Sequence, residues 1–156
     1  MFIFAPQKDL NMEQQQKFEV IIIGGSFAGM SAALALGRSL REVLIIDSGK
    51  PCNVQTPHYH NFLTHDGHSP DQILAQAKTD IAKYKTVHFI KDVATDGERV
   101  EDNFAISTKS GGRFLAKKLI IATGLHDIMP DIEGFAQCWG ISVLHCPYCH
   151  GYEVRN

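Results

Sequence analysis

FEVIIIGGSFAG, residues 18–29, joins a near-continuous apolar run to a glycine-rich turn. Such a run is typical of a parallel strand that is buried on both faces. Small and apolar side chains then recur at helical spacing over residues 28–40, and a second apolar run, EVLII at 42–46, ends at Asp47. A strand, a glycine turn, a helix and a strand within about 30 residues predict a βαβ unit. The fold class is therefore predicted to be α/β.

The rest of the chain offers weaker signals of the same architecture. Ser69, Pro70 and Gln72 form a capping box with proline in the first turn, which predicts that a helix begins there. The preceding connection, residues 48–69, is long and irregular, and its four histidines are interpreted as solvated loop side chains. Further strands are predicted at 86–90, 104–108, 113–116, 119–122 and 141–144, with a hairpin around 110–112 that provides a small β-meander.

Composition excludes several classes of protein. Apolar residues make up 44% of the 156 residues and charged residues 21%, so a packed core is expected. The formal net charge is −2 and no run of four or more basic residues occurs, which argues against nucleic-acid and membrane partners. No segment has the roughly 20 apolar residues that span a bilayer, and no secretory leader is recognised. A cytoplasmic protein is expected.

The glycine turn has the features of a dinucleotide site. Gly24 permits the tight turn after the strand, and Gly29 permits close packing of helix on strand. Ser26 stands where the G-x-G-x-x-G pattern has its second glycine, although Gly25 and a small serine leave room for a pyrophosphate. Asp47 lies where a carboxylate binds the adenosine ribose, which favours FAD or NAD over NADP at this site.

Cys146 and Cys149 form a C-x-x-C pair, C-P-Y-C, which in a reducing compartment indicates redox chemistry or metal binding. A helix start lowers the pKa of the first cysteine, and His150 is placed to move a proton during thiol exchange. Structural zinc, bound by the pair with two of Cys138, His145 and His150, is one alternative. Two inert buried cysteines are another. Cys52 is interpreted as an idle thiol.

In this order and spacing the motifs resemble those of the low-molecular-weight, thioredoxin-reductase-like FAD-dependent pyridine nucleotide-disulfide oxidoreductases. The pieces that carry the resemblance are IIIGGSFAGMSAA at 21–33, IIATG at 120–124 with Pro130 and Gly134 beyond it, and CPYCHGYE at 146–153. The resemblance implies a Rossmann-like FAD-binding domain that forms the N-terminal part of a two-domain flavoprotein. It covers residues 20–156.

The resemblance also assigns roles to residues. FAD would lie over the glycine turn, with Asp47 on the ribose, Asn61 near the flavin and a backbone contact from Val93 to adenine. Cys149 would face the flavin, and Cys146 would exchange with the substrate disulfide. His150 stands where thioredoxin-specific members have an aspartate, which argues against thioredoxin itself as the partner. The implied partner is a thioredoxin-like protein or a small-molecule disulfide or dithiol. The cofactor residues are Gly24, Gly25, Ser26, Phe27, Ala28, Gly29, Asp47, Asn61, Val93, Ala122, Thr123 and Gly124.

The predicted domain organisation has three parts. Residues 1–17 are expected to be a flexible tail, 18–125 the first segment of the FAD-binding domain, and 126–156 the crossover into a redox domain. Family members carry a second glycine-rich site for NADPH or NADH after the cysteines, and the resemblance implies that this site lies outside the chain. It also implies a homodimer.

The leading functional prediction is a disulfide oxidoreductase that passes electrons from NAD(P)H through FAD and the cysteine pair to a disulfide. One alternative is an FAD-dependent oxidase of small-molecule dithiols, in which the last steps run in the opposite direction. Another is a truncated, non-catalytic FAD domain or a zinc-stabilised interaction module.

Overall fold

A computed structural model of the chain describes residues 16–51 and 56–155. The predicted tail up to residue 15 and Cys52 lie outside the described residues. Among the described residues, no helix has both the length and the apolar character that crossing a membrane requires. In chain order the elements are β1 (Gln16–Ile23), α1 (Phe27–Arg38), β2 (Val43–Asp47), α2 (Pro70–Ile81), β3 (Val87–Lys91), β4 (Ala94–Val100), β5 (Asn103–Thr108), β6 (Arg113–Ile121), α3 (Phe135–Cys138) and α4 (Pro147–His150).

One mixed sheet of six strands organises the fold, in the order β3-β2-β1-β6-β5-β4. The four strands β3, β2, β1 and β6 are parallel, and β6, β5 and β4 are joined by antiparallel pairing into a meander. The chain leaves β1 toward β2 on one side and later returns to pair β6 on the other side. Ligands of α/β sheets bind at such a reversal of strand order, beyond the carboxyl ends of the strands. The predicted α/β class with a small meander is confirmed.

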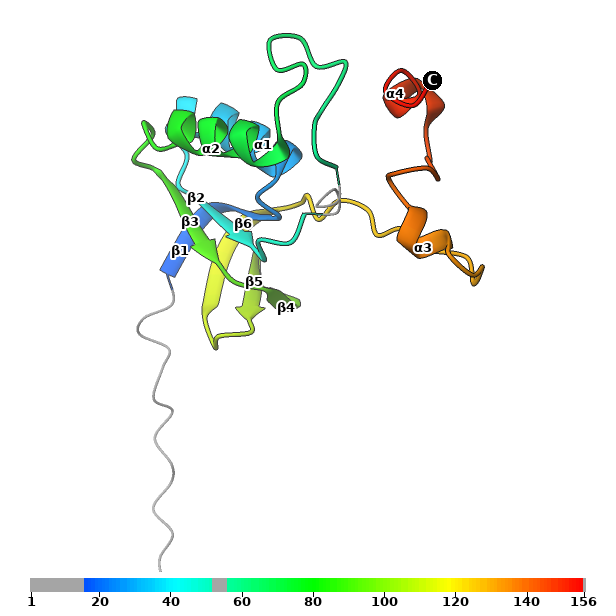
Figure 1. Cartoon of the computed structure of the whole chain (residues 1–156). Helices are drawn as coiled ribbons and strands as arrows, with labels where there is room; N and C mark the ends of the chain where they lie inside the picture. Colours follow the sequence, from blue (N-terminus) through cyan, green and yellow to red (C-terminus); the bar gives the residue numbers. More distant parts are fainter. Residues whose placement is uncertain (1–15, 52–55, 156) are drawn as a thin grey trace, which may run out of the picture.

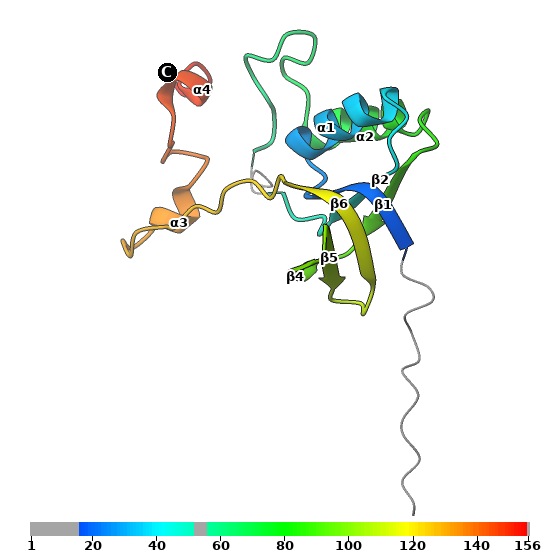
Figure 2. The same ribbon diagram turned by 180° about the vertical axis from the view of Figure 1, so that it is seen from behind.

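The two faces of the parallel strands are covered differently, because successive side chains of a strand point to opposite faces. Val20 and Ile22 face α1 and α2, which lie side by side on one face of the sheet (Figure 1). Ile21 faces the other way and packs with Ile106 of β5, a strand of the meander that Figure 2 shows from behind. Continuous apolar runs such as VLIID in β2 are thus explained by burial on both faces.

The helices begin where local sequence requires. Ser69 accepts a hydrogen bond from the backbone N–H of Gln72, and the Gln72 side chain accepts one from the Ser69 N–H, which confirms the predicted capping box of α2. On α1 the small residues Ala33 and Gly37 are buried, and Gly37 comes close to Tyr84 and Val87. Small residues on this helix therefore permit close packing against the sheet and the end of α2.

The predicted set of strands needs three corrections. The strand expected at 141–144 does not form, because the N–H groups of Ile141, Ser142 and Val143 all donate to the carbonyl of Cys138 in a tight turn. The strands expected at 113–116 and 119–122 are one strand, β6, which continues through two exposed lysines. The edge strand β4 was not predicted, since ATDGERV lacks an apolar alternation.

Ile45 tests the double-sided burial of the parallel strands. It is fully buried in the helix-side cluster, so Ile45→Ala should lower the free energy of unfolding by about 2–5 kcal/mol. Ile128→Ala is the matched control, because Ile128 is 92% exposed and its loss should cost less than about 0.5 kcal/mol. Urea unfolding followed by circular dichroism measures both, and equal effects would contradict the assignment of the core.

Candidate functional site

A concave site lies beyond the carboxyl ends of β1, β2 and β6, at the reversal of strand order. It is a cavity of about 450 Å³. Its walls are the turn from β1 to α1, the end of β2 with the residues after it, the start of the meander and the end of β6. The lining residues are Ile23, Gly24, Gly25, Ser26, Phe27, Ala28, Ile46, Asp47, Ser48, Lys50, Pro51, Asp92, Val93, Ala94, Ile121, Ala122, Thr123 and Gly124.

Three glycines allow this turn to form. Gly24 has φ +104°, and a Cβ there would lie 2.2 Å from the carbonyl oxygen of Ala122. A Cβ on Gly29 would lie 1.8 Å from the carbonyl oxygen of Gly24, so only glycine lets α1 approach β1 this closely. A Cβ on Gly25 would come within 2.8 Å of Asp47 and of Phe89. Gly29 therefore shapes the site from behind, without lining the cavity.

Asp47 is held in place by the turn itself. Its Oδ1 accepts a hydrogen bond of 3.0 Å from the Gly25 N–H, and its Oδ2 accepts one of 3.2 Å from the Gly49 N–H. An ionised carboxylate has about four lone-pair positions, so acceptors remain for the hydroxyl groups of a sugar. The backbone contacts thus fix a carboxylate at the cavity wall with capacity to bind a ligand.

The N-terminus of α1 forms part of the wall of the same cavity. Ser26 occupies the N-cap position, but its side chain makes no capping hydrogen bond. The first N–H groups of a helix have no partner within the helix, and the positive end of the helix dipole favours an anion there. No acidic residue occupies the first turn of α1. This uncapped end, with Phe27 and Ala28 in the wall, fits a pyrophosphate.

Asp92 is a lining residue that sequence reasoning missed. Its carboxylate accepts hydrogen bonds from the Ser110 hydroxyl and, at 2.8 Å, from the Val93 N–H. The contact with Ser110 contributes most, followed by the Thr108 hydroxyl and the Val93 N–H, and together they lower the pKa of Asp92 to about 2. Lys50 was also missed, and it brings a positive charge to the wall. Both residues lie in irregular segments, where no periodic pattern signals them.

The remaining predicted cofactor residues divide into two groups. Ala122, Thr123 and Gly124 line the cavity, as does Val93, whose carbonyl accepts a hydrogen bond from the Lys109 N–H. Asn61 does not line the cavity. Its side-chain amide instead donates a hydrogen bond of 3.4 Å to the hydroxyl of Tyr148, so its predicted contact with a flavin stays a prediction.

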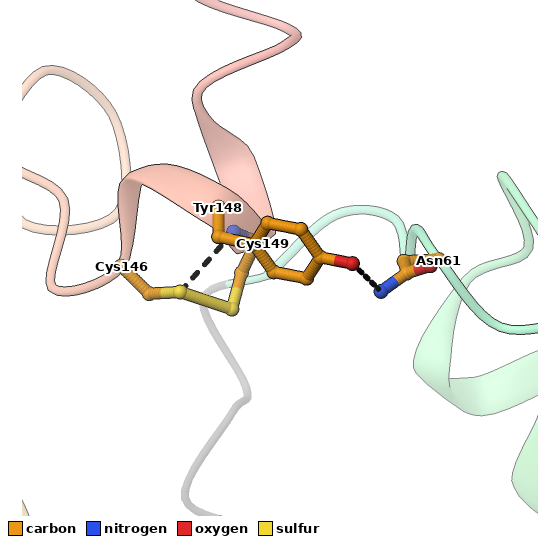
Figure 3. The surroundings of a disulfide bond; sticks show 4 residues. All are labelled: Asn61, Cys146, Tyr148 and Cys149. Carbon is orange, nitrogen blue, oxygen red and sulfur yellow. Dashed lines mark hydrogen bonds between the residues drawn. A yellow bond between two sulfur atoms is a disulfide. The ribbon is translucent and has the colours of Figure 1, made fainter.

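The cysteine pair lies at the start of α4, as predicted. Cys146 and Cys149 form a disulfide with Cα atoms 5.3 Å apart (Figure 3). Cys146 is the N-cap residue, and its Sγ accepts a hydrogen bond of 3.1 Å from the Cys149 N–H. A backbone donor at this sulfur stabilises the thiolate that reduction would produce. Cys149 is exposed, and Cys146 is half-buried.

A row of rings leads to His150 from α3. Phe135 stacks on Trp139 with centroids 5.7 Å apart, and Trp139 contacts His145 at 5.7 Å. His145 then meets the ring of His150 edge-on at 5.9 Å. His150 is thereby held beside the cysteine pair by packing on a neighbouring imidazole.

The zinc alternative has no geometric support in the described part of the chain. In residues 16–51 and 56–155, no group of three or more His, Cys, Asp or Glu side chains is placed to bind a metal ion. The sulfur atoms of Cys146 and Cys149 are bonded to each other, and Cys138 is a free thiol.

Comparison with known proteins places this geometry among redox flavoproteins. The family described as pyridine nucleotide-disulphide oxidoreductase matches residues 18–154. Thioredoxin reductase sirT of Leptosphaeria maculans is 38% identical over 142 residues, which are 89% of this chain and 43% of that protein. Thioredoxin reductase tcpT of Claviceps purpurea is 37% identical over 141 residues, 88% of this chain and 44% of the relative.

A solved structure agrees at the level of the fold. The oxidoreductase from Agrobacterium tumefaciens matches with a TM-score of 0.86 and 45% identity, covering 89% of this chain and 47% of the other. The chain thus spans less than half of the length of these three relatives.

The carboxylate of Asp92 supplies a pH-dependent test of the cavity wall. Because its pKa is lowered from 3.8 to about 2, its contribution to stability is present above pH 3.8 and is lost as the pH falls toward 2. Ser110→Ala removes the strongest contact and should move the pKa back toward 3.8. Ser48→Ala, whose hydroxyl accepts from the Lys50 N–H and does not contact Asp92, should leave it unchanged. NMR titration of the carboxyl carbons measures the pKa. If Asp92 titrates near 3.8 in the unaltered chain, the hydrogen bonds assigned to its carboxylate are wrong.

Proposed function

The chain belongs to the pyridine nucleotide-disulphide oxidoreductase family, and on that premise we propose that its cavity binds FAD and that Cys146 and Cys149 exchange electrons with it. The single observation that carries the proposal is the presence, in one chain, of a glycine turn that fits a dinucleotide and a C-x-x-C disulfide with Cys149 exposed. FAD, when bound, supplies a two-electron carrier.

The residues divide the binding of FAD among them. The uncapped N–H groups at the start of α1 bind the pyrophosphate, and Asp47 accepts hydrogen bonds from the ribose hydroxyls. Val93 and Asp92 form the wall at the adenine end, while Thr123 and Gly124 close the site where β6 ends. Lys50 offsets part of the pyrophosphate charge. A 2′-phosphate would meet the Asp47 carboxylate, so the proposed ligand of this cavity is FAD and not NADP.

The cysteine pair carries the exchange with substrate. Two electrons and two protons convert the Cys146–Cys149 disulfide to a dithiol. The Cys146 thiolate, stabilised by the Cys149 N–H, attacks a substrate disulfide, and a mixed disulfide forms as one substrate sulfur leaves as a thiolate. Cys149 then attacks Cys146 Sγ, which restores the internal disulfide and releases the second substrate sulfur. His150 donates and accepts the protons that the sulfur atoms exchange with solvent.

The whole protein's activity is proposed on the same basis. NAD(P)H is the proposed electron donor and a thioredoxin-like protein or small-molecule disulfide the proposed acceptor. A second candidate is oxidation of a small-molecule dithiol, with oxygen as the final electron acceptor. The observation that favours it is His150, because a neutral imidazole beside Cys149 accepts the proton that a substrate thiol loses as it attacks the disulfide.

A charge placed in the first turn of α1 tests the flavin site without harming the helix. Ala28 is exposed and lines the cavity. Ala28→Asp favours the helix dipole but repels a pyrophosphate, so it should weaken FAD binding by at least about tenfold while the melting temperature of the flavin-free protein holds or rises. Ser31→Asp on the same helix, outside this cavity, is the matched control and should retain flavin. Fluorescence titration with FAD gives both affinities, and equal affinity in the two variants would exclude this placement.

The redox pair is tested by the rate at which a dithiol bleaches the bound flavin under anaerobic conditions. Cys149→Ser should slow bleaching by dithiothreitol by more than about tenfold, because the path from substrate to flavin is broken. Cys138→Ser removes a thiol that is free in the described part of the chain and should leave the rate unchanged. Equal bleaching in the Cys149→Ser variant and the unaltered protein would end the proposal of a redox pair, and purified protein without flavin but with equimolar zinc would favour the interaction module.

A further inference from the structure

The segment that carries the disulfide is in contact with a loop that lies 87 positions earlier in the sequence. Asn61 Nδ2 donates a hydrogen bond of 3.4 Å to Tyr148 Oη, the hydroxyl of the tyrosine between the two cysteines (Figure 3). His60, the preceding residue, has its Nδ1 3.5 Å from Oε1 of Glu153. Two neighbouring residues of the loop therefore contact two residues that flank Cys149.

The loop at 58–68 is closed by its own hydrogen bonds. The Tyr59 N–H donates to the His68 carbonyl at 2.8 Å, and the Gly67 N–H donates to the Tyr59 carbonyl at 2.7 Å. Asn61 has φ +59°, and its N–H is bound by Asp66 Oδ1 at 2.7 Å. Asparagine tolerates this left-handed conformation better than most residues. The loop therefore presents the Asn61 side chain from a preset backbone.

Aromatic packing joins the same loop to the wall of the nucleotide cavity. Phe27, which lines the cavity, meets Tyr59 edge-on with centroids 5.1 Å apart and Phe62 at 6.4 Å. The phosphate-facing turn, the loop and the disulfide segment thus form one continuous series of contacts. By contrast, the Tyr148 side of α4 is open to solvent, since that residue is 80% exposed.

We propose that loop 58–68 is the docking element for the disulfide segment, with Asn61 and Tyr148 as positioning residues. Their hydrogen bond, with support from His60 and Glu153, holds Cys149 on the cavity side of the molecule while the flavin and the disulfide exchange electrons. This proposal rests on the proposed function and adds to it a role for the tyrosine of C-P-Y-C. It also gives Asn61 a second partner beside the flavin contact expected from the resemblance.

A double-mutant cycle on the purified, flavin-loaded protein tests the docking contact. Tyr148→Phe removes only the hydroxyl, and Asn61→Gly removes the side chain while tolerating the positive φ. With the disulfide intact, each change should raise amide hydrogen exchange at Cys149, His150 and Gly151 by about two- to tenfold, as expected for the loss of one exposed hydrogen bond. Dithiol-driven flavin reduction should slow by a similar factor, and FAD affinity after Tyr148→Phe should not change.

In the double variant, amide exchange should be no faster and flavin reduction no slower than in the more affected single variant, because both changes remove the same interaction. Tyr152→Phe is the matched control, since the Tyr152 ring packs under Arg155 with the guanidinium 3.5 Å from its centroid. Unchanged exchange and rate after Tyr148→Phe, or effects that simply add in the double variant, would overturn the proposal. Hydrogen exchange does not depend on electron transfer. It therefore tests the docking contact even if the Cys149→Ser variant shows that the proposed redox function is wrong.

Discussion

The close crossing of backbones at Gly24 and Gly29 is the constraint on which the site depends. The Gly24 carbonyl lies where a Cβ of Gly29 would stand, and Gly24 itself lies against the carbonyl of Ala122 at the end of β6. These two approaches hold the start of α1 close to the ends of β1 and β6, at the reversal of strand order. The start of α1 thereby forms part of the cavity wall, and the Gly25 N–H donates a hydrogen bond to Asp47. Any larger side chain at either position would separate the elements that form the wall.

Much of the fold could be predicted from the sequence, because a strand that is buried on both faces has a continuous run of apolar residues. β1, α1 and β2 follow from residues 18–47, and α2 follows from the capping box at Ser69. β4 was missed because this edge strand is exposed along most of its length and needs few apolar residues, and Gly97 interrupts what pattern it has. Ile141 to Leu144 look like a strand from their composition, but the carbonyl of Cys138 gathers their N–H groups into a turn. Periodicity carries no information about such a local closure.

Some residues of the candidate site could be predicted from the sequence, and others could not. The glycine turn, Asp47 and the residues at the end of β6 could be found because each follows a recognisable strand. Asp92 and Lys50 line the cavity from irregular segments, and only the folded chain brings them there. The contact between Asn61 and Tyr148 joins residues 87 positions apart in the sequence. Without a periodic element on either side, nothing in the order of residues indicates that pair.

Under the proposed function, the cavity and the disulfide would be two redox centres that one chain holds within a single series of contacts. In that case the flavin and the Cys146–Cys149 pair accept electrons in the same molecule. An anaerobic reductive titration of the purified protein with dithionite counts the electrons that each chain takes up. We expect an uptake of about four electrons, two for the flavin and two for the disulfide. An uptake of about two electrons, unchanged when both cysteines are replaced by serine, would contradict it.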